Sequence, residues 1–554
     1  MPAEGNPGTF VRRNEVLPQD FAPVTSRINQ QQPVEATTPL WDNQSIRPPG
    51  DSSTEVPEFC GPSSSEHTLN VVSGNLKAMG IPGAILEKPT PRMGSALGSS
   101  SRLTQYGPLM KLLNMDPLWD VKKQDAFHLI DDWCYHVGSL FRLVTRSETL
   151  KVASNVFEVL ENAQRDGPFY KGGRVLEVLF NDDTNKMKLV LAIERTLESG
   201  GRNDQAQRLF QSITEAVESI MWHPNGIHDI QLLILVALYH YHLDDEVRTG
   251  RFSGFAARLC LEMGLHRREI VEKTFPNPEE RSVALRTFWS VYMLERRTSL
   301  DLGIPFYIQD SYVHPSLFEL DESDSILSIL LQWTKLAGKT WNALNSQGER
   351  GAELKLDDLD YINYQILHWY DQLPNNLKLS QNRAERQIQY ENLAYHQAIL
   401  VVRKHHLLNL IFRPVLQSFS RINQNQRYAQ TAITIVKESI QTPSEFREHT
   451  AIIDKHALFF KHLLLTAFGN LLLAVVNASS LFWDSVRNEF DTALHLVKVL
   501  SAKSSPMMRL WSRLQGLREL QTKLLHASNA CVSNNESGDF RFKNCSHLFQ
   551  TWDR

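Results

Sequence analysis

Amphipathic helical patterning runs through most of the chain. From about Leu109 to about Leu525, apolar residues recur at spacings of three and four, while the alternating runs typical of strands are hard to find. In the first such segment, Phe127, Ile130 and Val137 fall at helical spacings. We therefore predict an all-α fold, a large multi-helix domain in which successive helices pair and stack to bury their apolar faces.

Composition separates an N-terminal segment from the helical part. Residues 1–108 hold 14 of the 25 prolines, together with clusters of serine and glycine. Because such a sequence buries too little apolar surface to offset the loss of chain entropy, we predict disorder there, with at most short recognition pieces within residues 67–86. We expect the main helical domain over residues 109–480, further helices over residues 481–530 and a polar tail over residues 531–554.

The net charge and the cysteines bear on whether the chain binds nucleic acid and on the cellular compartment in which it works. The net charge of −4 gives no global attraction to nucleic acid, and the basic doublets at residues 122–123, 267–268 and 296–297 are far apart. The five cysteines are scattered and odd in number, which favours reduced thiols inside the cell over a disulfide framework. The first residues also lack the apolar core of a secretion signal.

One stretch has the length of a membrane span. Residues 457–476 are almost entirely apolar, but Lys461, His462 and Asn470 interrupt them. Because a central cation is costly in lipid, we predict a buried core helix here and no membrane partner.

The most informative stretch runs from Phe252 to Pro315. An amphipathic helix is predicted to end at Gly264, since glycine accepts the left-handed backbone of a helix C-terminus. A second helix should open at Glu279 and Glu280, because acidic side chains favour the positive end of the helix dipole. The residues Leu-Gly-Ile-Pro would close that second helix.

This stretch resembles the regulatory middle region of fungal transcription factors of the zinc-cluster class, of the xylanolytic-activator type. The positions that match the family pattern, in its order, are Gly254, Ala257, Arg258, Gly264, Leu265, His266, Arg267, Glu280, Arg286, Phe288, Trp289, Leu294, Arg296, Leu302, Gly303 and Pro305. Glu295 stands where the family usually has Asp, and Ile304 stands where it usually has Arg. We predict that these motif residues hold the fold, with an arginine head able to pair with a carboxylate such as Glu295.

Two later segments extend the resemblance to roughly residues 120–480. They contain the family-like positions Trp369, Leu373 and Pro374, then Tyr395, His396, Leu407, Leu408, Arg413 and Pro414. The resemblance implies a domain that holds a transcription factor in check, responds to metabolites or coregulators and supports dimeric assembly. It implies no catalytic residue, and the sequence leaves the effector-binding residues unknown.

The sequence predicts no metal-binding motif and no catalytic motif. The family's zinc cluster uses six cysteines in two triplets, whereas Cys60 is the only cysteine before residue 130, so we expect no zinc cluster in this sequence. The histidine pairs at residues 240 and 242 and at residues 405 and 406 are predicted to be core or rim residues, not ligands. Acidic doublets lack the third carboxylate of a magnesium face, and no G-x-S-x-G, P-loop or G-x-G-x-x-G motif occurs. We predict no cofactor and no enzymatic activity.

The sequence thus predicts a nuclear transcriptional regulator that acts through its helical domain, by partner binding or effector response. Other transcription regulators or coregulators, or a homo- or heterodimer, would be its partners, and DNA would be contacted only indirectly or through a missing N-terminal module. Two alternatives stay open at this point. One is a zinc-finger DNA-binding factor whose finger is missing from this sequence, and the other is a helical enzyme or ligand-binding protein on the same scaffold.

Overall fold

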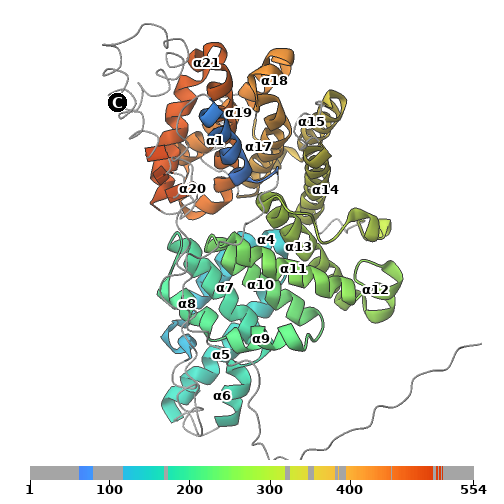
Figure 1. Cartoon of the computed structure of the whole chain (residues 1–554). Coiled ribbons are helices and arrows are strands. Elements are labelled where there is room, and N and C mark those ends of the chain that lie inside the picture. Colours follow the sequence, from blue (N-terminus) through green and yellow to red (C-terminus); the bar gives the residue numbers. More distant parts are fainter. Residues whose placement is uncertain are drawn as a thin grey trace, which may run out of the picture. The chain divides into compact units, whose positions relative to one another are not determined.

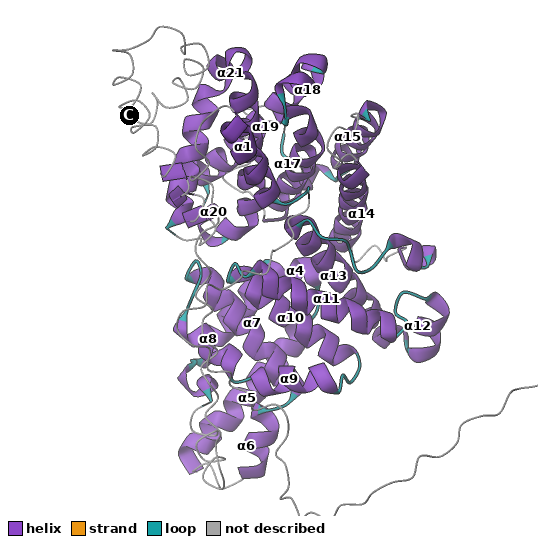
Figure 2. Cartoon of the chain, in the orientation of Figure 1, coloured by secondary structure: helices purple, strands orange, loops and turns teal. Residues whose placement is uncertain are grey.

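The computed structural model describes residues 62–78, 116–166, 172–318, 325–346, 355–380, 385, 395–450, 452–502, 507–508, 511–512 and 514–515. Within these ranges it contains 19 α-helices, a few short 3-10 helices and no strand, as Figure 2 shows. The predicted all-α class is confirmed.

The first helices are short to medium in length. In chain order they are α1 (Ser65–Ala78), η2 (Pro117–Asp120), α3 (Lys123–Tyr135), α4 (Val137–Phe141), α5 (Arg146–Asp166), α6 (Gly172–Leu179), α7 (Asp182–Glu198), α8 (Asp204–Gln211), α9 (Thr214–Trp222), α10 (Ile227–His242), α11 (Glu246–Glu262) and α12 (Arg268–Thr274).

The later helices include the longest ones. They are α13 (Pro278–Leu302), η3 (Asp310–Tyr312), η4 (Pro315–Phe318), α14 (Ser325–Ser346), α15 (Leu356–Asp371), η6 (Asn375–Leu377), α17 (Tyr395–Leu416), α18 (Phe419–Gln424), α19 (Gln426–His449), α20 (Ile452–Lys455) and α21 (Ala457–Ser501).

Side-chain caps fix where several of these helices begin. The carboxamide oxygen of Asn181 accepts from the Thr184 amide at 2.8 Å, and the carboxylate of Asp245 accepts from the Arg248 amide at 3.1 Å. Asn277 caps α13 in the same way, with proline at the first helical position. Each cap satisfies a backbone donor that the helix itself cannot pair, which makes these starts local properties of the sequence.

Helices that follow one another in sequence pack against one another in space. The packing order runs from α7 to α10, α11, α13, α14, α15 and α17, and α17, α19 and α21 pack on one another at the C-terminal end (Figure 1). Their buried apolar side chains join into one continuous cluster. The predicted stacking of successive helices is therefore what the described residues show.

The long helix α21 packs on α1, α17 and α19. Its backbone leaves helical geometry at Ala478, where a kink divides it into two helical pieces. It is also the one helix of the described residues that is long and apolar enough to cross a membrane, and 89% of its most apolar window is buried inside the protein. Burial of this kind is what the prediction of a core helix requires.

Part of the N-terminal segment is ordered, and it overlaps residues 67–86, where the sequence allowed a short recognition piece. Residues 65–78 form α1, which packs on α21 (Figure 1), with Leu69, Val72 and Leu76 buried. The contact is close, because a Cβ placed on Gly469 of α21 would lie 2.7 Å from the Thr68 methyl group. The other residues predicted to be disordered, apart from residues 62–64, and the tail over residues 531–554 lie outside the described residues. The domain boundaries as a whole stay a prediction.

The anchor of α1 explains how a proline-rich segment can still be ordered in part. Arg413 of α17 donates from Nη1 to the backbone oxygens of Pro62 and Ser64, at 2.9 and 3.1 Å, and Ser63 Oγ donates to Leu300 O at 2.7 Å. Long-range bonds from the core hold this segment, and composition does not reveal them.

Candidate functional site

The turn that follows α11 is built around Gly264. Its φ of +71° lies in the left-handed region, and its amide donates to Leu261 O at 3.1 Å. The next amide, of Leu265, donates to Cys260 O at 3.0 Å. These two bonds form a Schellman closure, which needs a residue of positive φ at this position. Glycine takes that conformation without steric cost.

Gly303 ends α13 with the same geometry. Its φ is +73°, and the Ile304 amide donates to Ser299 O at 2.9 Å. Pro305, the last motif residue, is exposed on the connection that follows. Both glycines of the motif therefore set the direction in which the chain leaves a helix.

Trp289 lies in an aromatic cluster within the core. It is fully buried, and its ring centroid lies 4.8 Å from Phe288, 5.4 Å from Tyr292 and 4.7 Å from Phe318. The nearby edge-to-face and tilted contacts add to the large apolar area that the indole buries. Ala257 and Leu265 of the motif are buried as well.

Three polar motif residues lie nearer the surface. Arg258 is exposed, and its Nε donates to Glu262 at 2.7 Å. Arg286 is half-buried and donates to a serine hydroxyl one turn earlier in α13 at 2.7 Å. His266 is also half-buried, where burial and the neighbouring Arg267 lower its pKa. These contacts are local to single helices or turns, so they add little to the packing between helices.

Glu295 and Arg296 are adjacent and buried, but they use different partners. Glu295 accepts from Ser299 Oγ and from the Tyr307 amide, both at 2.9 Å. Burial raises the pKa of Glu295 to about 7, although these hydrogen bonds favour its charged form. Arg296 instead forms an ion pair with Asp310 across the turn after α13. The arginine partner that the sequence suggested for Glu295 is thus replaced by hydrogen bonds from its own helix end and turn.

The Arg296 guanidinium is enclosed by aromatic rings. It lies 4.3 Å from the ring centroid of Tyr292 and 4.9 Å from that of Phe306, and it donates to Ile308 O at 3.0 Å. Helix α14 lies close to this guanidinium at Gly338. A Cβ on Gly338 would lie only 2.7 Å from the Arg296 Nη1 atom. Because the planar guanidinium both stacks on rings and donates hydrogen bonds, even lysine in place of Arg296 would lose these contacts.

A buried group of charges connects the motif helices to α21. Lys461 of α21 is 3% exposed and forms ion pairs with Asp244, on the turn before α11, at 2.9 Å, and with Glu246, the first residue of α11. Although burial opposes its charge, these two carboxylates raise the pKa of Lys461. Lysine therefore remains an ammonium ion in the interior.

The same group continues into α13. His462 Nε2 lies 3.3 Å from the Asp301 carboxylate, and Arg297 donates to Tyr241 OH at 2.8 Å and lies 3.8 Å from Asp301. Burial raises the pKa of Asp301 to about 7, against the pull of Arg297. Because removing one member of such a group leaves buried charge without a partner, the group fixes α21 against α11 and α13. We call Tyr241, Asp244, Glu246, Arg297, Asp301, Lys461 and His462 the charge cluster.

Sequence reasoning noticed only part of the charge cluster. Lys461 and His462 were seen as interruptions of an apolar run, and Asp244 as part of an acidic doublet, but nothing along the chain pairs them across more than 200 residues. A cation within an otherwise apolar helix is the signal that points to a buried partner.

The histidine pairs that were weighed as metal ligands lie in the core. Side chains of His240, His242, His405 and His406 are all buried. Burial lowers the pKa of His240 to about 4 and those of His242 and His406 to about 3, with nearby arginines acting in the same direction. His240, His242 and His406 are therefore neutral imidazoles at physiological pH, as expected of core histidines.

One pocket among the described residues has a volume of about 970 Å³. It opens between α15, α17 and α19 and is lined in part by Tyr370, Lys404, Glu438 and Gln441. This volume suits a small organic molecule, and the lining combines an aromatic ring with both signs of charge.

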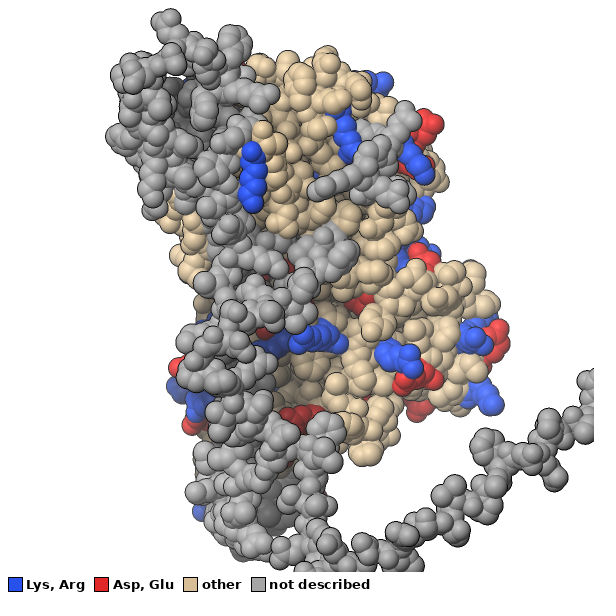
Figure 3. All heavy atoms as spheres, in the orientation of Figure 1, with Lys and Arg blue, Asp and Glu red and all other residues tan. Residues whose placement is uncertain are grey.

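Surface charge is mixed on the face that Figure 3 draws. There, the basic side chains of the described residues are scattered, and several lie beside acidic ones. Such a surface does not present the continuous basic field that binds a phosphate backbone.

These features define a large all-helical domain in which some of the motif residues, such as Trp289 and Arg296, are buried in the interior and others lie at its surface. Residues 205–338 match the family described as the fungal specific transcription factor domain. That range runs from α8 into α14 and includes every motif residue between Gly254 and Pro305. The resemblance seen in the sequence is therefore confirmed over residues 205–338, which match the fungal specific transcription factor domain.

Several curated proteins are similar to the chain at low identity. The negative regulator of pleiotropic drug resistance STB5 of Candida glabrata is 24% identical over 257 residues, covering 44% of this chain and 24% of that protein. Sorbicillinoid biosynthetic cluster transcription factor 2 of Penicillium rubens is 22% identical over 331 residues, 53% of this chain and 47% of that protein. The transcriptional activator protein acu-15 of Neurospora crassa is 23% identical over 217 residues, 35% of this chain and 22% of that protein.

The match therefore spans less than half of each of these relatives. Their names are those of transcription regulators and not of enzymes. No solved structure matches the chain.

Proposed function

We propose that the chain is a nuclear transcriptional regulator in which the helical domain receives a partner or a small effector and passes the response on. The observation that carries this proposal is the family match over residues 205–338, supported by relatives named as regulators. The relatives include a negative regulator and an activator, so either direction of response is consistent with the family.

The charge cluster supplies a physical route for such a response. It joins α11 and α13, within the family match, to α21, which packs in turn on α17 and α19. The 970 Å³ pocket lies among α15, α17 and α19. A ligand that shifts α17 or α19 would therefore also move α21, and through the buried ion pairs the motif helices α11 and α13. Tightly packed helices and buried ion pairs tend to switch between discrete arrangements and do not deform gradually.

A reporter experiment in a fungal cell tests the proposal. The full chain is fused to a DNA-binding domain of unrelated specificity, and transcription from its operator is compared with that driven by the DNA-binding domain alone. We expect a change in transcription, of either sign, and a nuclear signal from a fluorescent fusion. Unchanged transcription by a soluble and nuclear fusion would contradict the proposal.

Dimer formation and coregulator binding are the partner interactions that we propose. Sedimentation of the purified chain over a range of concentrations would detect self-association, and proximity labelling in the same cells would identify nuclear neighbours. A monomeric chain with no labelled transcription regulator would contradict this part.

A further inference from the structure

Helices α3 and α7 pack on each other and carry metal-ligand side chains at matched spacing. His128, Asp132 and His136 follow one another at intervals of four residues along α3 and its cap, and Glu194 and Glu198 are four residues apart on α7. Because a helical turn takes about 3.6 residues, each set lies along one side of its helix. The structure brings the two sides together.

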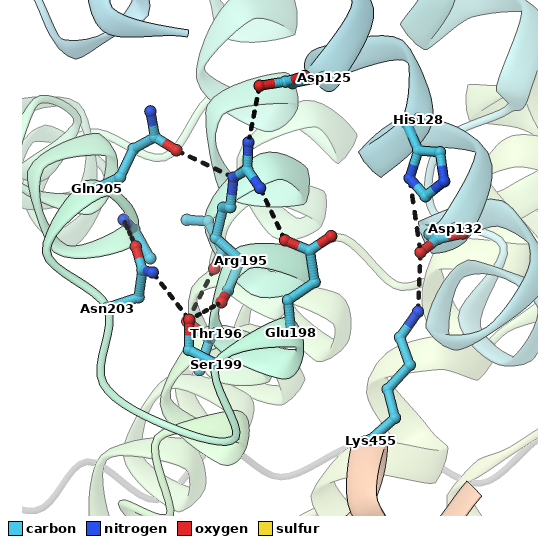
Figure 4. A network of polar contacts seen from close by, with 12 residues as sticks. Asp125, His128, Asp132, Arg195, Thr196, Glu198, Ser199, Asn203, Gln205 and Lys455 are labelled. Atoms are coloured by element: carbon cyan, nitrogen blue, oxygen red, sulfur yellow. Dashed lines mark hydrogen bonds and ion pairs between the residues drawn. The ribbon is translucent and has the colours of Figure 1, made fainter. Parts of the chain in front are cut away.

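The five side chains form two overlapping groups. In the inner group, one ligand atom each of Asp132, His136 and Glu194 lie within 4.8 Å of one another, and in the outer group the same holds for His128, Asp132 and Glu198. Asp132 belongs to both groups. Figure 4 shows the outer side, where the His128 ring is directed at the Asp132 carboxylate and Glu198 pairs with Arg195 at 2.8 Å.

Glu194 is the observation that favours the inner group. Its side chain has no exposed surface, and neither carboxylate oxygen has a hydrogen-bond partner among the described residues. His456, buried beside the group with its ring centroid 4.8 Å from that of His136, also has an unpartnered Nε2. Buried polar atoms are nearly always satisfied in proteins, so a carboxylate left in this state calls for a partner.

One cation already lies at the edge of the group. Lys455 Nζ is 2.8 Å from Asp132 Oδ2, and that ammonium is about one quarter exposed. It accounts for one oxygen of Asp132, and, against the burial that raises the pKa of Glu194, its charge acts to lower the pKa of that carboxyl, but among the described residues neither oxygen of Glu194 has a hydrogen-bond partner. Lys455 would thus compete with a second cation for Asp132 without satisfying Glu194.

We propose that Asp132, His136 and Glu194 bind one divalent first-row transition metal ion, with Zn²⁺ as the representative of the class. One imidazole and two carboxylates make a nitrogen and oxygen donor set that suits this class better than Mg²⁺ or Ca²⁺, which take oxygen ligands. The ion would tie α3 to α7, and its fourth position would be open to water or to His456. This site goes beyond the proposed function and does not depend on it.

Calorimetric titration of the full, chelator-treated chain with Zn²⁺ tests the site. We expect one tight site per chain, a rise in unfolding temperature with Zn²⁺ and no comparable rise with Mg²⁺, because an ion bound only to the folded state stabilises it. Co²⁺ gives a second readout, since its near-ultraviolet absorption should lack the thiolate charge-transfer band that cysteine ligands produce. A thiolate band, or no tight site at all, would overturn the proposal.

Two matched variants on α7 place the ion. Glu194→Gln keeps the volume of the side chain and removes its charge, so the chain should still fold while Zn²⁺ affinity falls at least about tenfold. Glu198→Gln, one turn away, should leave the affinity unchanged. Equal affinity in Glu194→Gln, or an equal loss in Glu198→Gln, would contradict the inner site.

Lys455→Met gives an independent check, because it tests whether Zn²⁺ affinity rises when the competing cation is removed. Removing the competing ammonium should tighten Zn²⁺ binding, because Asp132 then has no other cation to hold. Weaker binding in this variant would also count against the assignment.

Discussion

Replacing Lys461 by methionine should lower the free energy of unfolding by about 3 kcal/mol. Methionine keeps the length of the side chain but removes the ammonium that pairs with Asp244 and Glu246. The side chains of Lys461 and Asp244 are only 3% and 5% exposed, so the Asp244 carboxylate that loses this ammonium has little access to water. Glu246 is 26% exposed and can be hydrated in part, which puts the estimate at the lower end of the range for a broken buried pair.

Urea unfolding, followed by far-ultraviolet circular dichroism, measures this loss. The midpoint should fall while the slope of the transition stays the same, since both chains expose the same surface on unfolding. Hydrogen exchange should locate the loosened amides at the start of α21 and in the turn before α11. Adding Asp244→Asn to the variant should recover part of the stability, because the two side chains are in direct contact.

Arg258→Met is the matched control for loss of one cation. Its pair with Glu262 is solvent-exposed, so its loss should lower the free energy of unfolding far less than the loss of Lys461 does. If Lys461→Met were as stable as the unchanged chain, or no less stable than Arg258→Met, the charge cluster would not fix α21 and the proposed route would fail.

Four further results are expected. Trp289→Ala should lower the free energy of unfolding in urea by about 3–5 kcal/mol, since it empties a fully buried aromatic site. Gly264→Val should reduce the yield of soluble protein, because it strains a backbone with φ of +71°. Normal stability of both variants would show that the motif does not hold the fold. Because the folded pKa of Glu295 is about 7, above its ordinary value of 4.5, stability should fall as pH rises from 4.5 through 7, by up to about 3 kcal/mol, and Glu295→Gln should remove this component; an unchanged pH profile would refute it. Limited proteolysis should leave residues 62–78 bound to the helical core after nearby cleavage, and their rapid digestion would contradict the docking of α1 on α21. Fluorescence titration near physiological salt should find weak DNA binding without sequence preference by this chain, and a nanomolar, sequence-dependent signal would contradict that expectation.

Local signals in the sequence predicted the helical class and the ends of the motif helices. Helical periodicity is a property of neighbouring residues, and so are the caps and the glycines that end α11 and α13, since each depends on residues within one or two turns. The family resemblance around Gly264 and Trp289 rests on the same short stretch, which lies inside the matched range.

The contacts that order part of the N-terminal segment could not be read from composition. Composition predicted disorder through residue 108, with at most short recognition pieces within residues 67–86, and Arg413 and Gly469 hold the segment at residues 62–78 through contacts that span more than 300 residues of chain. A local count of prolines and serines cannot include the free energy that a distant docking surface contributes.

By itself, the sequence determined that the chain is helical, that it carries the fungal domain motif and that its glycines end the motif helices. Only the tertiary structure decided which polar groups meet: Lys461 with Asp244, Arg296 with Asp310, and Glu194 with Asp132 and His136. The reason is physical. Helix formation and capping depend on residues a few positions apart, whereas the partner of a buried charge depends on which helices pack side by side, and that is settled by the whole core at once.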